Sequence, residues 1–253
     1  MAGPHRLLAG KNLSPKKHMG QNFLADPSTA EMIVRRADVS DAVILEIGSG
    51  LGALTLPAAA RARYLYAVEK DRDLVDLLTA VLSDRQIENV EVINKNIFDV
   101  NIRAIADDAN ATLTVMGNLP YNISSQVVVS IILNRDVIDR AILMLQSEMA
   151  VRLYAGPGGR AYGRLSVMTQ YCAAVRRIAR IAAHQFSPKP KVDSEVVEIH
   201  FRDPATPATD EKLLSEVVKA AFGQRRKTLR NALIGSALGV DSALVGQLLA
   251  ESG

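Results

Sequence analysis

The stretch that decides the fold is residues 43–52, which read VILEIGSGLG. Its first half, Val43 to Ile47, is a short apolar run of the kind found in strands buried on both faces of a sheet. Its second half places glycines at three alternate positions, where they let the backbone turn sharply and lie close to a ligand. A helical pattern follows from about residue 51 to residue 62, and its first turn would expose free N–H groups. The stretch therefore predicts a strand, a glycine turn and a helix.

The same alternation continues outward along the chain. Four more short apolar runs are predicted to be strands: residues 64–69, 90–93, 112–116 and 141–145. Helical patterns are predicted over residues 27–37, 71–83 and 164–174. Strands rich in Val, Ile and Leu that alternate with helices favour an α/β fold with a parallel sheet covered on both faces. Two later strands are expected over residues 178–182 and 196–201, joined by the proline-rich loop 187–191, and they could form an antiparallel edge.

Three segments are expected along the chain. Residues 1–20 show no sustained periodicity and carry basic residues but no acid, which predicts a mobile basic arm. Pro204 and Pro207 mark a boundary, after which the apolar spacing is helical throughout. We therefore expect a main domain over residues 21–203 and a small helical domain over residues 204–253.

Composition excludes several classes of protein. The chain has 253 residues, of which 48% are hydrophobic and 23% charged, so it is neither a disordered nor a collagen-like protein. Cys172 is the only cysteine, which excludes an intrachain disulfide and favours a reducing compartment. No apolar run approaches the roughly 20 residues that a bilayer span needs. These features predict a cytoplasmic protein without a membrane segment.

Positive charge is clustered rather than large. The net charge is only +3, but no acid precedes Asp26, and a second acid-free group lies near the C-terminus. That group consists of Lys219, Arg225, Arg226, Lys227 and Arg230. Basic clusters on a nearly neutral body suit a polyanion such as nucleic acid, although a solvated basic face has the same pattern.

Glu69 stands at the end of the strand that follows the glycine turn. An acid in this place can accept hydrogen bonds from ribose hydroxyls. The glycines are spaced Gly-x-Gly-x-Gly after an acid, Glu46, whereas dinucleotide-binding loops use Gly-x-Gly-x-x-Gly. The combination favours a cofactor that contains a nucleoside. The alternative is a glycine-rich turn that binds nothing.

A tetrapeptide with its own chemistry, Asn118-Leu119-Pro120-Tyr121, follows the fourth strand. Ligands bind at the carboxyl edge of a parallel sheet, where this segment would lie. The amide oxygen of Asn118 and a nearby backbone carbonyl could accept the two N–H bonds of an exocyclic amine. Tyr121 offers a face on which a base can stack. The arrangement suits methylation of an aromatic amine by a sulfonium, although Asn and Pro also form ordinary turns.

In these motifs the chain resembles a known family, the ribosomal RNA adenine N6,N6-dimethyltransferases, and in particular its small-subunit branch. The resemblance covers nearly the whole chain, and the matching segments are residues 20–24 (GQNFL), 46–52, 118–121 (NLPY), 162–167 (YGRLSV), 186–194 (FSPKPKVDS) and 222–231. It implies a class I S-adenosylmethionine (SAM) methyltransferase fold, Rossmann-like, with a mostly parallel seven-stranded sheet and a small C-terminal helical domain.

The resemblance also implies a set of cofactor contacts. The expected residues are Gln21, Asn22, Leu24, Gly48, Gly50, Glu69, Asn96 and Asn118. Glu69 would hold the ribose hydroxyls. Relatives have an aspartate after the third strand that contacts the adenine of the cofactor. Asn96 stands there in this sequence, and Asp99 is the alternative if the register slips. Gln21 and Asn22 also suit a capped turn before the helix that Asp26 begins.

For the substrate, the resemblance implies contacts from the whole tetrapeptide, with Leu119 acting through its backbone, Pro120 restricting the loop and Tyr121 stacking on the target adenine. Phe186 would pack on the other face of that adenine, or it is a core aromatic. Arg225, Arg226, Lys227 and Arg230 are expected to contact RNA phosphates, and no metal site is expected.

The implied reaction is SAM-dependent dimethylation of two adjacent adenines in a hairpin loop near the 3′ end of small-subunit rRNA, within an assembling subunit. Nothing in the sequence demands more than a monomer. Two alternatives share these features. One is a large-subunit rRNA adenine methyltransferase of the macrolide-resistance type, and the other is an rRNA-binding assembly factor without catalysis.

Overall fold

The computed structural model describes residues 13–224 and 226–252. These residues form two compact units. The first contains the described residues up to Val151 together with Ala174–Arg202, and the second contains Arg152–Ala173 and the described residues from Asp203 onward. The main boundary falls beside the one expected from Pro204, but the sequence does not indicate that residues 152–173 belong with the C-terminal segment.

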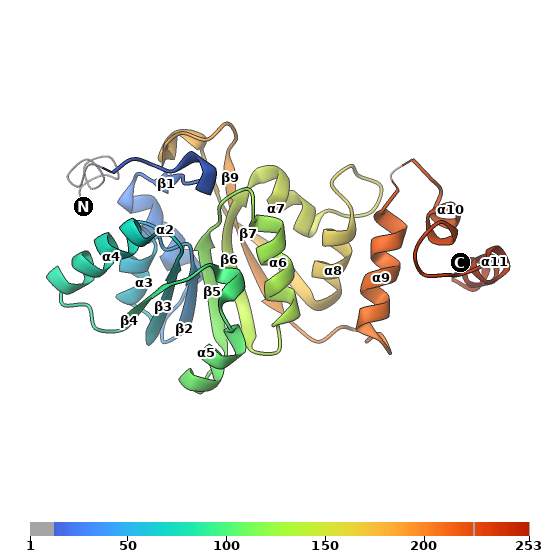
Figure 1. The fold of residues 1–253 in the computed structure, drawn as a ribbon, viewed down its shortest axis with the longest axis horizontal. Helices are drawn as coiled ribbons and strands as arrows, with labels where there is room; N and C mark the ends of the chain where they lie inside the picture. The colour runs from blue at the N-terminus through green and yellow to red at the C-terminus, as the bar shows by residue number, and fades with distance from the viewer. Residues whose placement is uncertain (1–12, 225, 253) are drawn as a thin grey trace. The chain divides into compact units, whose positions relative to one another are not determined.

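A seven-stranded sheet forms the centre of the first unit (Figure 1), in the order β4-β3-β2-β5-β6-β9-β7. The strands are β2 (Val43–Ile47), β3 (Tyr64–Glu69), β4 (Val90–Asn94), β5 (Leu113–Asn118), β6 (Ile138–Gln146), β7 (Ala173–Ile181) and β9 (Ser194–Phe201). The five strands from β4 to β6 are parallel, and β9 is antiparallel to β6. The expected mostly parallel sheet is confirmed. A separate two-stranded sheet pairs β1 (Phe23–Leu24) with β8 (Phe186–Ser187).

Helices connect the strands of the first unit: α2 (Pro27–Ala37), α3 (Thr55–Ala59), α4 (Arg72–Asp84), α5 (Ile102–Ala109), α6 (Ser124–Leu133) and α7 (Ser147–Tyr154), which reaches into the second unit. α2 has the predicted bounds because the Asp26 side chain accepts from the Ser28 N–H and Pro27 occupies the first helical position. α3 is shorter than predicted, since it begins only at Thr55.

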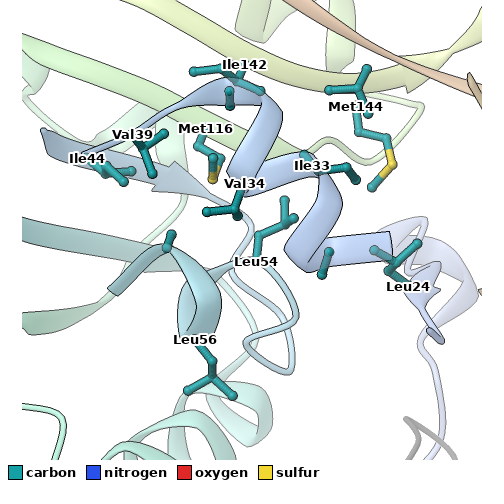
Figure 2. Close-up of a cluster of buried hydrophobic side chains, with 14 of the residues drawn as sticks. Leu24, Ile33, Val34, Val39, Ile44, Leu54, Leu56, Met116, Ile142 and Met144 are labelled. Atoms are coloured by element: carbon teal, nitrogen blue, oxygen red, sulfur yellow. The ribbon is translucent and has the colours of Figure 1, made fainter. Parts of the chain in front are cut away.

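The packing of the core explains why β2 is apolar at every position except Glu46. Ile44 belongs to a cluster with Ile33 and Val34 of α2 on one face of the sheet (Figure 2). Its neighbours Val43 and Leu45 point to the other face and are also buried. A strand covered on both faces has no polar side to present to water, so the alternation typical of a half-exposed strand is absent.

The second unit is helical, with α8 (Arg164–Cys172), α9 (Glu211–Phe222), α10 (Leu229–Ile234) and α11 (Ser242–Glu251). Contacts between α8 and α9 explain why residues 152–173 join it. The hydroxyl of Tyr171 donates to Glu211 at 3.2 Å, and the ring of Tyr162 meets that of Phe222 edge-on. Within the part of the chain that the structure describes, no helix has the length and apolar character that a membrane crossing requires.

Candidate cofactor and substrate site

A cavity of about 310 Å³ lies in the first unit where the parallel strands end. Five segments supply most of its described lining, and the sheet explains why four of them meet, since the carboxyl ends of its parallel strands share one edge. The segments are residues 18–24, the glycine turn from Glu46 to Leu51, the end of β3 with Glu69, residues 95–98 after β4, and the tetrapeptide from Asn118 to Tyr121. The structure thus brings together most residues that the sequence marks as functional.

Glu69 lines the cavity next to the glycine turn. Its Oε2 accepts from the Gly50 N–H at 2.9 Å, and its Oε1 accepts from the Asp71 N–H at 2.8 Å. Burial raises the pKa of Glu69, while these backbone donors oppose the rise. Gly50 has a φ of 56°, and a Cβ there would lie 3.3 Å from the Phe23 ring. The turn needs glycine for both conformation and space.

Glu46 is a second buried acid in the cavity wall, 1% exposed. The Thr55 hydroxyl donates to its Oε2 at 2.6 Å. Burial raises the pKa of Glu46 to about 7, the nearby Glu69 charge adds to this, and the Thr55 hydrogen bond opposes it. The wall therefore holds a carboxyl group that changes charge near neutral pH.

Asn118 is the last residue of β5, a strand that runs two residues further than the sequence indicated. Its Nδ2 donates to the backbone carbonyl of Asn22 at 2.9 Å. The next residue, Leu119, donates its N–H to the Met144 carbonyl at 3.1 Å. Among the described residues, none donates a hydrogen bond to Asn118 Oδ1 or to the Leu119 carbonyl. Two acceptors on adjacent residues are thus available at the cavity.

Tyr121 ends the tetrapeptide as a half-buried side chain. Its hydroxyl lies 3.4 Å from the Oγ of Ser194, a residue that is 1% exposed at the start of β9. Burial raises the pKa of Tyr121, so the phenol stays neutral at ordinary pH. Sequence reasoning missed Ser194, which lies 73 residues away along the chain and leaves no local signal.

In the described part of the expected arm, residues 13–20, three residues line the cavity: His18, Met19 and Gly20. Lys16 Nζ lies 2.6 Å from Asp71 Oδ1 and 2.7 Å from Asp73 Oδ2. Gln21 lines the cavity, but its amide is engaged elsewhere: Nε2 donates to Asp71 Oδ2 at 2.8 Å, and Oε1 accepts from the Lys16 N–H at 2.7 Å. Residues 1–12 of the arm lie outside the described residues.

Asn96 lines the cavity, whereas its alternative Asp99 is exposed and is not among the described lining residues. The Asn96 side chain caps a short 3-10 helix by accepting from the Phe98 N–H at 3.4 Å. Phe98 also lines the cavity although 43% of it is exposed. Sequence reasoning missed Phe98; an aromatic residue two positions after Asn96, the expected adenine contact, was the signal available.

Phe186 does not join the other predicted site residues. It is 4% exposed, belongs to the core cluster with Leu24 and Val196, and pairs with Leu24 across the β1–β8 sheet. It is not among the described residues that line the cavity. Its packing is that of a core aromatic, the alternative that the sequence left open, and its contact with the target adenine stays a prediction.

The predicted RNA-contact residues lie in the second unit, around the start of α10. Arg226, Lys227 and Arg230 are all exposed. The Arg230 guanidinium also donates to the hydroxyl of Ser242. Arg225, the fourth residue of this group, lies outside the described residues.

The cavity fits SAM, the cofactor expected from the sequence. Glu69 presents carboxylate oxygens, the glycine turn leaves room for close approach, and Phe98 and Leu51 add apolar surface. Ser49 in the glycine turn has a buried Oγ that no described residue hydrogen-bonds, so a polar group of a ligand could serve as its partner. Among the described residues, no group of three or more His, Cys, Asp or Glu side chains could hold a metal ion.

Known proteins are similar to this chain in sequence and in fold. Residues 12–243 match the profile of the family described as ribosomal RNA adenine dimethylase. A protein of Desulforapulum autotrophicum named ribosomal RNA small subunit methyltransferase A is 49% identical over 252 residues, covering 98% of this chain and 88% of its own.

Two solved structures share the fold. A dimethyladenosine transferase from Plasmodium falciparum superposes with a TM-score of 0.73 at 25% identity, covering 83% of this chain and 74% of its own. The 23S rRNA methyltransferase ErmE superposes with a TM-score of 0.68 at 28% identity, covering 84% and 83%. With its cavity, its tetrapeptide and these relatives, the chain belongs to the ribosomal RNA adenine dimethylase family of SAM-dependent methyltransferases.

Proposed function

We propose that this protein transfers methyl groups from SAM to the N6 amines of two adjacent adenines near the 3′ end of small-subunit rRNA, two methyl groups to each adenine. The observation that carries the proposal is the geometry of Asn118. Its Nδ2 is held by the Asn22 carbonyl, so Oδ1 and the neighbouring Leu119 carbonyl are left as acceptors at the cavity. The name of the 49% identical relative supports the small subunit as the source of the RNA.

The chain's own residues would act on the amine. The lone pair of an adenine N6 is delocalised into the ring, which makes the amine a poor nucleophile. Hydrogen bonds from its two N–H groups to Asn118 Oδ1 and the Leu119 carbonyl would draw the lone pair out of conjugation and aim it into the cavity. Tyr121 would stack on the ring and hold it in place. These groups supply orientation and polarisation, which are large terms when a pocket excludes water.

SAM, when bound, supplies a methyl group on a positively charged sulfur. The N6–carbon bond would form as the sulfur–carbon bond breaks, S-adenosylhomocysteine would leave as the neutral thioether, and the positive charge would pass to the amine that Asn118 and Leu119 hold. The same two acceptors would stabilise that charge until the extra proton leaves to solvent. No strong base is required, because the product ammonium of an aromatic amine is a strong acid. A second methylation would repeat these steps with one N–H group fewer.

Roles for the remaining parts follow from the same proposal. Residues 21–203 would bind the cofactor and the target base, and residues 204–253 would bind RNA. Arg226, Lys227 and Arg230 are exposed and suited to phosphate contacts. A target base must leave its stack to enter a cavity of this kind, which favours adenines in a hairpin loop. The partner would be an assembling small subunit, approached by a monomer in the cytoplasm where that subunit forms.

The test offers labelled SAM to undermethylated small subunits and to large subunits in parallel, followed by nucleoside analysis of the RNA. Dimethyladenosine only in the small subunit is the expected result. Label in the large subunit would assign the protein to the macrolide-resistance type of reaction. Absence of label from both, with SAM still bound, would contradict the proposed catalysis and favour an rRNA-binding assembly role.

A further inference from the structure

The residues from Leu13 to Asn22 form a segment, the N-terminal strap, that crosses from α4 to the tetrapeptide. Two of its side chains, Lys16 and Gln21, bind the Asp71 carboxylate, at 2.6 Å to Oδ1 and 2.8 Å to Oδ2. The Lys16 N–H also donates to Gln21 Oε1 at 2.7 Å, which closes the arrangement. The Asp71 side chain is 3% exposed, whereas that of Lys16 is 33% exposed.

Asp71 keeps its charge in this position. Burial alone would raise its pKa, but hydrogen bonds from Lys16 and Gln21 and the Lys16 charge hold the pKa of Asp71 below its ordinary value. The same side chain accepts from the Asp73 N–H and so caps α4. Asp71 therefore links the strap to a fixed helix end through charge-assisted hydrogen bonds, which are stronger than neutral ones.

The residues on either side of Gln21 in the strap contact the tetrapeptide. Gly20, with a φ of 67°, approaches so closely that a Cβ would lie 3.2 Å from Asn122 Oδ1 and 3.5 Å from Pro120 Cβ. The Asn22 carbonyl accepts from Asn118 Nδ2 at 2.9 Å. A carbonyl can bind only the donor end of an amide. The strap therefore decides which end of the Asn118 side chain is left for the substrate.

We propose that Asp71 is a positioning residue for methyl transfer, which holds the strap so that the Asn22 carbonyl keeps Asn118 Oδ1 toward the target amine. Gln21 then serves the strap through its amide rather than the cofactor. The inference rests on the proposed function, because it assigns Asp71 an effect on a reaction that Asn118 would promote. Without the link at Asp71, the Asn118 amide would sample both orientations, and only one of them presents an acceptor.

The central variant is Asp71→Asn. Asparagine caps helices about as well as aspartate, so α4 keeps its cap while the charge opposite Lys16 is removed. We expect the single-turnover rate of methyl transfer at saturating SAM and rRNA to fall about tenfold. Lys16→Met should lower it similarly, and Lys16→Arg should restore most of it. The matched control is Asp26→Asn, the same exchange at the cap of α2, which should leave the rate unchanged.

A double-mutant cycle separates positioning from simple stabilisation. If Asp71 acts through Asn118, then Asp71→Asn costs nothing further in an Asn118→Ala background, because no amide is left to orient. Losses that multiply in the double variant would overturn the proposal. So would an undiminished rate in Asp71→Asn.

A second measurement does not depend on activity. The side-chain NH₂ signal of Asn118, assigned in NMR spectra by its loss in Asn118→Ala, should exchange slowly with solvent in the wild type and faster in Asp71→Asn. Equal exchange in the two proteins would overturn the positioning role. If the wild type transferred no methyl group to either subunit, the proposed function would fail, yet this exchange comparison would still decide whether Asp71 orders Asn118.

Discussion

The cavity of the first unit and the start of α10 in the second unit use polar side chains in opposite ways. Glu46 and Glu69 in the cavity wall, and Asp71 close behind Glu69, are between 1% and 9% exposed, and each accepts hydrogen bonds at defined distances. Around α10 the basic residues Arg226 and Lys227 are exposed. The first arrangement fixes individual atoms, and the second presents charge to water.

The difference teaches what each region can recognise. Buried polar groups act in a medium of low dielectric, where a polar atom without a well-placed partner costs much binding free energy. Such a site therefore selects a chemical group by its geometry. Exposed cations attract phosphates over several ångströms, are screened by salt and act nearly independently of each other. Substitutions in the cavity should therefore change rates or stability steeply, whereas substitutions at α10 should change RNA affinity gradually.

The steepest effect is expected at Asn118. Asn118→Ala removes the acceptor for the target amine and should lower kcat about 1,000-fold, the usual cost of one group that stabilises developing charge. SAM binding, measured by calorimetry, should weaken far less, because Asn118 is only one of the eight expected cofactor contacts. Asn134→Ala, at the end of α6, is the matched control. A loss of SAM binding as large as the loss of rate would show that the side chain has a structural task instead.

The next effect concerns stability and pH. In the folded protein the pKa of Glu46 is raised to about 7 from an ordinary 4.5, so the folded state holds its proton more tightly than the unfolded chain. Its contribution is therefore present at low pH and lost as pH rises through this window, by ~3 kcal/mol in all. Glu46→Gln keeps an acceptor for Thr55 and has no charge to bury, so its unfolding free energy should fall less.

Urea unfolding of both proteins without SAM at pH 5 and pH 8 measures this difference. Glu31→Gln, an exposed acid on α2, serves as the control and should follow the wild type. If Glu46→Gln lost as much stability as the wild type between the two pH values, Glu46 would not be the buried acid that titrates there, and the contrast between the cavity and the surface would weaken.

Tyr121 tests whether the cavity recognises the base by stacking. Tyr121→Ala removes the ring and should lower kcat/KM for rRNA about 100-fold, from ~1–3 kcal/mol of stacking together with poorer positioning of the base. Tyr121→Phe keeps the ring, removes only the hydroxyl that meets Ser194, and should retain most of the activity. Equal losses in the two variants would mean that the hydroxyl, rather than the ring, carries the function of Tyr121.

The smallest effect per residue is expected at α10. Replacing Arg226, Lys227 and Arg230 together with alanine should weaken RNA binding and reduce the slope of log affinity against log salt by about one for each phosphate that the protein no longer binds. Turnover at saturating RNA should persist. Lys212→Ala, an exposed cation on α9, is the control. An unchanged salt slope would remove the α10 cluster from the RNA interface.

Features encoded by neighbouring residues were predicted correctly from the sequence. The apolar run of β2, the glycine turn after it and the Asp26–Pro27 start of α2 all occur where expected. α5 and α6 were not predicted. α6 is apolar on most of its surface, with Val127, Val128 and Ile131 buried, so it lacks the one-sided pattern that marks an amphipathic helix.

The candidate site also has residues that motifs predicted and contacts that only the structure revealed. Motifs marked Asn22, Glu69, Asn96 and Asn118, and the structure places all four at one cavity. No motif indicated that Ser194 meets Tyr121, and the sequence left open whether Phe186 belongs to the core. These outcomes depend on which strands become neighbours, and the residues of each strand do not carry that information by themselves.

By itself, the sequence determined the α/β class, the loop that faces a cofactor and the residue types that suit amine methylation, because each depends on a periodicity or on spacing within a few residues. Only the tertiary structure decided that Lys16 binds Asp71, 55 positions away, and that α8 packs on α9. The physical reason is that backbone conformation responds mainly to adjacent side chains. Contacts between distant residues form only when burial of the whole core brings their elements together.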